Sequence, residues 1–248
     1  MPDSIDAVIE ELDAIVKNSI EQASPLGYFA ALYKRVTIQV RDAIKENRFE
    51  DNERMEKLDI IFANRYLEAY RSFQEDKVPT QSWQVAFKQA DSNKLIVLQH
   101  LLLGMSAHIN LDLGIAAAQA TRENPLASKS DFMSINKILS DLINDTQTRL
   151  TRIFRPLGLI DRLLGPIDEK LSLFSIGYAR DKAWTQTLEL SLSNGSEQLK
   201  LIAERDQAVA NFSSSLVRPP KISLRILLRL IRLLERGRVS DRIKTLDT

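Results

Sequence analysis

The most constraining feature of this chain is residues 93–122, a long segment predicted to be helical and apolar on almost every side. On a helical wheel at about 100° per residue, leucine, isoleucine, valine, methionine, alanine and glycine cover most of the circumference. A helix without a wide polar face has no side to present to solvent, so other helices must enclose it. The segment therefore predicts a core helix.

Helical periodicity also dominates the rest of the chain, and no segment shows the alternation of a strand. Glycine and proline, eight of each, fall between the periodic segments. We predict one all-α domain over residues 1–248, a bundle of mostly antiparallel helices around the central helix at about 93–122. The predicted helices are 3–22, 25–47, 51–76, 80–90, 93–122, 129–155, 157–164, 167–193, 196–216 and a basic amphipathic terminal helix at about 220–236.

Composition excludes several classes of protein. The chain has no cysteine, which rules out disulfides, thiolate metal sites and a cysteine nucleophile. No uninterrupted apolar run reaches the ~18–20 residues of a membrane span, and the acidic, amphipathic start is unlike a signal peptide. Basic residues are not interleaved with aromatic or polar base readers, so no nucleic-acid partner is predicted. We expect a cytoplasmic protein.

The central segment nevertheless carries polar groups into the predicted core. His100 and His108 are eight residues apart, about 12 Å along a helix, so they cannot bind one metal ion together. His108 and Asp112 are four residues apart and can meet on one face. A carboxylate beside a buried imidazole fixes its tautomer and raises its basicity. We predict no metal site and treat this pair as the centre of a candidate site.

A second helix, 51–76, offers a partner for this pair. Asp59 lies in the middle of its apolar face, between Tyr66 and Tyr70, and Arg65 lies at the edge. A carboxylate at the centre of an apolar stripe is seldom without a role. If this helix packs on the central one, Asp59 is expected to approach His108 or His100.

Three interpretations of these polar groups stay open. The first is a satisfied buried network that only fixes helix register. The second is a pocket for a largely apolar small molecule such as a lipid, which requires a cavity of a few hundred Å³ beside His108. The third, a metal site, lacks a suitable ligand pattern. In the second interpretation, His108 is a base or ligand, Asp112 orients it, and Asp59 is a second acid or anchor. The predicted polar lining residues are His100, Asn110, Arg65, Tyr66 and Tyr70.

Two stretches, "RMEKLDIIFANRYLEAY" and "LLLGMSAHINLDLGIA", resemble an uncharacterised all-helical family, the domain-of-unknown-function family 5995. The second contains the element Ala-His-Ile-Asn-x-Asp-Leu at residues 107–113. The resemblance implies an all-α fold in one domain. It implies no activity and no cofactor, so the function stays open.

The end of the chain is the second unusual region. From Leu216 onward, nine lysines and arginines face three acids, a net charge of +6. The predicted stripe of Arg225, Arg229, Arg232 and Arg236 runs along a helix otherwise covered by leucine and isoleucine. One interpretation is a last bundle helix, buried on most sides with the arginines in water. The alternative is a surface that binds an anionic membrane or a protein partner.

Overall fold

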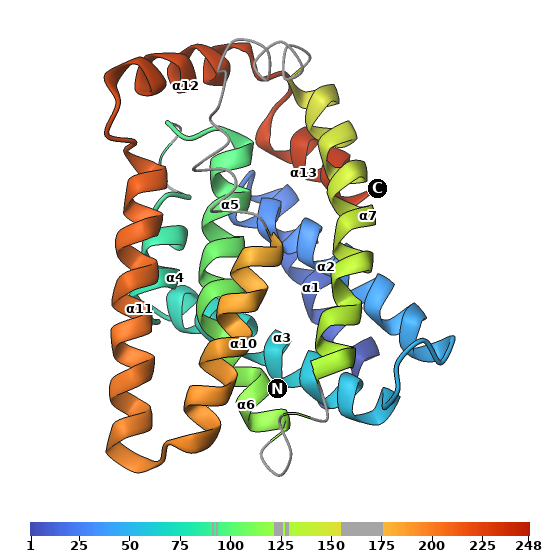
Figure 1. The fold of residues 1–248 in the computed structure, drawn as a ribbon. Coiled ribbons are helices and arrows are strands. Elements are labelled where there is room, and N and C mark those ends of the chain that lie inside the picture. Colours follow the sequence, from blue (N-terminus) through green and yellow to red (C-terminus); the bar gives the residue numbers. More distant parts are fainter. Residues whose placement is uncertain (91, 93, 122–125, 127–128, 155–175) are drawn as a thin grey trace.

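The computed structural model of the protein describes residues 1–90, 92, 94–121, 126, 129–154 and 176–248 (Figure 1). All regular elements in this part of the chain are helices, which confirms the predicted all-α class. In chain order they are α1 (Ile5–Glu21), α2 (Leu26–Lys45), α3 (Asn52–Gln74), α4 (Gln81–Phe87), α5 (Val97–Ala107), η1 (His108–Asp112), α6 (Leu113–Ala120), α7 (Lys129–Ile153), α10 (Ile176–Leu192), α11 (Gly195–Val217), α12 (Ile222–Leu234) and α13 (Val239–Asp247).

The predicted core helix corresponds to α5, η1 and α6, which run through the middle of the bundle (Figure 1). Helices α2, α4 and α11 pack on α5, whereas α3 and α10 pack on α6. Apolar residues around the whole circumference thereby find partners, which is why this segment needs no polar face. One stretch, Val97–Ala120, is long and apolar enough to cross a membrane by length and composition, but 78% of its most apolar window is buried inside the fold.

A close approach between α2 and α5 depends on a glycine. A Cβ added at Gly104 would lie 2.4 Å from the Phe29 ring, closer than atoms can approach without a shift. The missing side chain lets Phe29 reach the centre of the bundle, where it contacts Tyr66 and Trp83. This aromatic cluster joins α2, α3 and α4 to the central helix.

Several helix boundaries differ from the sequence-based prediction. The helix expected at 93–122 begins at Val97 and is not α-helical throughout, because η1 is a π-helical turn. The helix expected at 80–90 covers only Gln81–Phe87. Of the helix expected at 167–193, the described part begins at Ile176, and the helix expected at 157–164 lies outside the described residues.

A short helix at the end of the chain was not predicted. Helix α13 packs on α1, α2 and α7, and its Ile243 and Leu246 are almost fully buried. Only nine residues long, it carries too few apolar positions for a clear periodic signal. The C-terminal segment is therefore part of the main hydrophobic core, which also contains Val8 and Leu12 of α1.

Candidate functional site

The central helix widens into a π-helical turn at the predicted histidine–aspartate pair. Within η1, the Leu113 N–H bonds to the His108 carbonyl, five residues back. Arg205 of α11 donates from Nε to the carbonyl oxygen of Asn110, at 2.7 Å, and so satisfies a backbone group within the turn. Single π-turns inside α-helices are rare and occur frequently at functional sites. The sequence pattern does not reveal this turn, because its residues also fit an ordinary α-helix.

Asp112 is the centre of a buried hydrogen-bond network. One carboxylate oxygen accepts from Arg65 Nε at 2.8 Å, and the other accepts from Trp83 Nε1 at 2.8 Å and lies 3.4 Å from His108 Nδ1. Burial alone would raise the pKa of Asp112, but the hydrogen bond from His108 and the charge of Arg65 lower it below its usual value. Asp112 is therefore an anion in the core, held by three donors.

This network fixes the chemical state of His108. Burial lowers the pKa of His108 below its usual value despite the neighbouring carboxylate, so the ring is neutral at physiological pH. Because Asp112 faces Nδ1, the proton belongs on Nδ1 and the lone pair on Nε2. The ring stacks on Phe62 with centroids 3.6 Å apart and meets the edge of Tyr33 at 4.4 Å. Buried Nε2 has no hydrogen-bond partner among the described residues.

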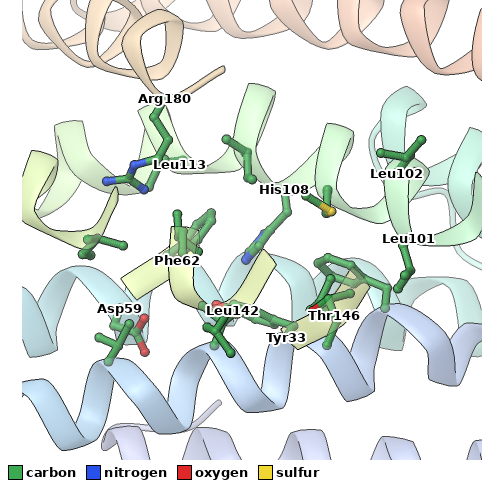
Figure 2. Close-up of a pocket in the computed structure, with 18 of the residues that line it drawn as sticks. Tyr33, Asp59, Phe62, Leu101, Leu102, His108, Leu113, Leu142, Thr146 and Arg180 are labelled. Carbon is green, nitrogen blue, oxygen red and sulfur yellow. The ribbon is translucent and has the colours of Figure 1, made fainter. Parts of the chain in front are cut away.

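A cavity of about 630 Å³ adjoins this histidine (Figure 2). Its walls come from α2, α3, α5, η1, α6, α7 and α10, and most of the lining side chains are apolar. The volume lies within the range of about 300–1,000 Å³ of small-molecule sites. The cavity beside His108 that the ligand-binding interpretation requires is thus present. Figure 2 shows His108 pointing into the middle of the pocket, with Leu101 and Leu102 toward one end.

Asp59 and Tyr33 add further polar groups to this cavity. Both line it, and neither Asp59 Oδ2 nor the Tyr33 hydroxyl has a hydrogen-bond partner within the described part of the chain. Burial, reinforced by the charge of Glu56, raises the pKa of Asp59 to about 7. Burial likewise raises the pKa of Tyr33 well above its usual value. Asp59 therefore shares the cavity with His108, as the sequence suggested, although no direct hydrogen bond links their side chains in the described structure.

Several polar residues of the cavity wall were not identified from the sequence. Thr146 of α7 and Arg180 of α10 line the cavity, and each has a buried polar atom, Oγ1 and Nε respectively, unpartnered among the described residues. Tyr33, on α2, was also missed. These three positions lie on helices whose packing against the central segment could not be deduced from periodicity. Only the arrangement of helices in space brings them together.

None of the five predicted lining residues lines the cavity. His100 is buried beside Tyr28 on another side of α5, where burial and the charge of Arg232 lower its pKa to about 4. The Asn110 amide donates to Ser106, at 3.4 Å. Tyr66 and Tyr70 lie on the same face of α3 as Asp59 but further along the helix, where they pack in the aromatic cluster with Trp83 and Phe87 and do not line the cavity. Arg65 does not line the cavity either, but it holds Asp112 and so belongs to the network behind His108.

Across the described residues, no group of three or more histidine, cysteine, aspartate or glutamate side chains is close enough to hold a metal ion. Asp59, His108 and Asp112 thus form no such group. The site is a polarised imidazole in an apolar cavity, with a carboxyl group and a phenol as its polar neighbours.

Comparison with known proteins places the chain in a family. The model of a family of unknown function, DUF5995, matches residues 5–219. The chain belongs to DUF5995. No curated protein and no solved structure matches it. The DUF5995 match includes every residue of the cavity and of the Asp112 network, and it ends before α12 and α13 begin.

The arginine-rich helix α12, beyond the DUF5995 match, lies across one end of the bundle (Figure 1). The interpretation of a helix buried on most sides is wrong: Ile231 is its one fully buried residue, whereas Leu230 is 52% exposed and Leu233 is 81% exposed. The arginines do not form one solvated stripe either. Exposed positions are taken by Arg229 and Arg236, while Arg225 donates to the carbonyls of Pro219 and Pro220, and Arg232 contacts Glu235.

Proposed function

We propose that this protein binds a largely apolar small molecule in the cavity beside His108. The observation that carries the proposal is the convergence of three unpartnered, buried polar atoms on one apolar cavity: His108 Nε2, Tyr33 Oη and Asp59 Oδ2, as judged among the described residues. A buried polar atom without a hydrogen bond is costly. A ligand that supplies the missing partners would remove that cost.

The composition of the wall favours this class of ligand. Small-molecule sites are mainly apolar and contain a few polar groups that orient the ligand. Here leucines from α5 and α7 and a methionine from α3 line the same space as His108. A molecule with a long apolar part and at least one hydrogen-bonding group matches this wall.

The same groups are suited to acid–base chemistry on the bound molecule. In this role His108 is the base, because Nε2 carries the lone pair and Asp112 stabilises the charge that forms on the ring. Asp59, whose pKa is raised to about 7, is the acid. A general acid and base work best when their pKa values lie near the operating pH.

Filling the cavity tests the binding proposal. Leu102 lines the cavity and is half-buried, so Leu102→Trp can occupy the space with limited strain. Leu199→Trp on α11 is the matched control, because that side chain is 70% exposed and outside the cavity lining. The probe is Nile red, a neutral apolar dye, titrated by fluorescence. Unfolding midpoints recorded alongside verify that both variants fold.

The expected result is saturable binding to the wild type, weakened about tenfold or more by Leu102→Trp, a difference of about 1.4 kcal/mol. Leu199→Trp should bind as the wild type does. Absence of saturable binding to the folded wild type would contradict the proposal. So would equal affinities of wild type and Leu102→Trp.

As a second candidate function, we propose that α12 contacts an anionic membrane surface. The specific observation is its row of exposed apolar side chains, all more than half exposed. They are Ile222, Ile226, Leu230, Leu233 and Leu234. Basic residues flank this row, and α12 itself contains no acidic residue. Apolar insertion together with basic flanks is the pattern of interfacial helices.

Vesicle flotation tests this second candidate. Because α13 packs into the core, removing the whole C-terminal segment would unfold the protein, so exposed side chains must be changed instead. Leu230→Gln/Leu233→Gln should abolish flotation with phosphatidylserine-containing vesicles. The control Leu192→Gln/Leu199→Gln alters two other exposed leucines, on α10 and α11, and should float as the wild type does. Equal recovery of the wild type with neutral and anionic vesicles would contradict the candidate.

A further inference from the structure

The cavity wall contains a buried cation, Arg180, that forms no ion pair within the described part of the chain. Arg180, on the first turns of α10, is only 3% exposed, yet no carboxylate among the described residues forms an ion pair with it. Buried arginines are normally paired with acids because an isolated charge is poorly solvated in the protein interior. Burial lowers the pKa of Arg180 to about 10, which still leaves the guanidinium charged at physiological pH.

The existing contacts of Arg180 satisfy only part of the guanidinium. One terminal nitrogen donates to the carbonyl oxygen of Phe132, and the guanidinium carbon lies 4.4 Å from the centre of the Phe132 ring. A cation over an aromatic face gains some stabilisation. Nε, however, is buried and has no acceptor in the described part of the chain. Arg180 also lines the cavity, so a ligand held there can contact its side chain.

The nearby acids do not neutralise Arg180. Asp131, next to Phe132, accepts hydrogen bonds from the Arg54 side chain and from the backbone N–H groups of Glu50 and Asp51, just before α3. Asp181 follows in sequence but is exposed to solvent. Asp59 lines the same cavity but forms no ion pair with Arg180 in the described part of the chain. The negative charge that would complement Arg180 is therefore not supplied by these side chains.

Resting on the binding function proposed above, we propose that Arg180 binds the carboxylate of an amphipathic ligand whose hydrocarbon chain fills the cavity. An arginine fork matches a carboxylate in geometry as well as in charge. A single guanidinium balances one negative charge. The doubly charged head of a phosphate monoester would leave one charge uncompensated in an apolar space that also contains Asp59.

The arrangement of the wall gives the ligand a direction. In Figure 2, Arg180 and Asp59 lie toward one end of the pocket, His108 lies in the middle, and Leu101 and Leu102 lie toward the other end. A carboxylate at Arg180 therefore places the chain past His108 toward the leucines. The histidine then faces a carbon within the chain and not the carboxylate itself.

The test compares four compounds that share one hydrocarbon chain: dodecanoic acid, its methyl ester, dodecanol and dodecyl phosphate. Affinities are measured by displacement of Nile red at pH 8, where the carboxylic acid is ionised. The variants are Arg180→Met, which removes the charge and keeps an apolar side chain, and Arg152→Met, the same change at an exposed position of α7 outside the cavity lining. Thermal unfolding confirms that each variant is folded.

The wild type should bind dodecanoate about tenfold or more tightly than dodecanol and the methyl ester, and more tightly than dodecyl phosphate. Arg180→Met should remove this preference without lowering the affinity for dodecanol. Arg152→Met should preserve the preference. If Arg180→Met does not fold, Arg180→Lys retains the charge and should keep the order of affinities.

Other outcomes overturn the inference in distinguishable ways. Equal wild-type affinities for dodecanoate and dodecanol would refute the role of Arg180 and leave the apolar binding site intact. Tighter binding of dodecyl phosphate than of dodecanoate would show that Arg180 prefers a phosphate headgroup, which would refute the carboxylate assignment. Failure of all four compounds and of Nile red to bind would overturn both the inference and the proposed function.

Discussion

Replacing Asp112 by leucine should be among the most damaging single changes in this protein. The carboxylate accepts from Arg65 and Trp83, each at 2.8 Å, and faces His108 at 3.4 Å. Leucine has a similar size but no acceptor, so the buried Trp83 N–H and the Arg65 charge lose their partner. Removing one partner of a buried pair costs about 3–5 kcal/mol. Because the Arg65 side chain is 24% exposed and can turn toward water, we expect the lower part of that range.

Urea unfolding followed by far-UV circular dichroism measures this loss. For a chain of this size each kcal/mol lowers Tm by about 2–4 °C, so a loss of about 3 kcal/mol should lower the melting temperature of this variant by about 6–12 °C. Two control variants complete a double-mutant cycle: the single variant Arg65→Met and the double variant Asp112→Leu/Arg65→Met. The double variant leaves no uncompensated charge, so it should lose less stability than the two single variants together.

Additivity of the two substitutions within about 0.5 kcal/mol would refute this reasoning. It would mean that Arg65 and Asp112 are not energetically coupled. A loss below about 1 kcal/mol for Asp112→Leu would refute it as well, since such a loss is ordinary for a surface change.

Three further predictions concern the candidate site and the helix packing beside it. The folded pKa of Asp59 is about 7, whereas its unfolded pKa is near 3.9. As pH rises between these values, Asp59→Asn should therefore gain stability relative to the wild type by about 1.4 kcal/mol per pH unit, measured in paired urea titrations. A difference in stability that does not change with pH would contradict the raised pKa. His100 and His108 have lowered pKa values, so their contribution to the free energy of unfolding increases as pH rises to about 6.5, opposite to that of Asp59. Both histidines are present in the wild type and in the variant, so their contribution cancels in the comparison. Nitrogen NMR should show His108 neutral and protonated on Nδ1 near pH 6.5, and a ring protonated on Nε2 would exclude the proposed base. Gly104→Ala should destabilise the protein by about 1–3 kcal/mol, because the new Cβ meets Phe29 at 2.4 Å; a variant as stable as the wild type in urea would show that Phe29 can move aside.

The fold class and three residues of the candidate site, His108, Asp112 and Asp59, can be predicted from the sequence for a definable reason. An apolar helix with few polar interruptions marks both the core and the groups that the core must accommodate. The pairing of His108 with Asp112 follows from their spacing, and the burial of Asp59 follows from its place on an apolar face. Both are local properties of one helix, which periodicity describes well.

What the sequence did not reveal depends on how distant helices meet. Tyr33, Thr146 and Arg180 reach the cavity from three helices whose relative rotation is set by packing. The π-turn was invisible because it adds no unusual residue. The exposure of α12 was misjudged for a related reason: amphipathicity shows that a helix has an apolar face, but not whether another helix covers it.

Native mass spectrometry of the purified protein, followed by organic extraction of the same sample, tests the central claim most directly. It is repeated for the folded Leu102→Trp variant, whose side chain occupies the cavity. We predict that the wild type carries a small amphipathic molecule, released on extraction, and that the variant carries much less of it. An unliganded wild-type mass that is unchanged by added dodecanoate would contradict the account, and the His108 network would then serve only the stability of the bundle.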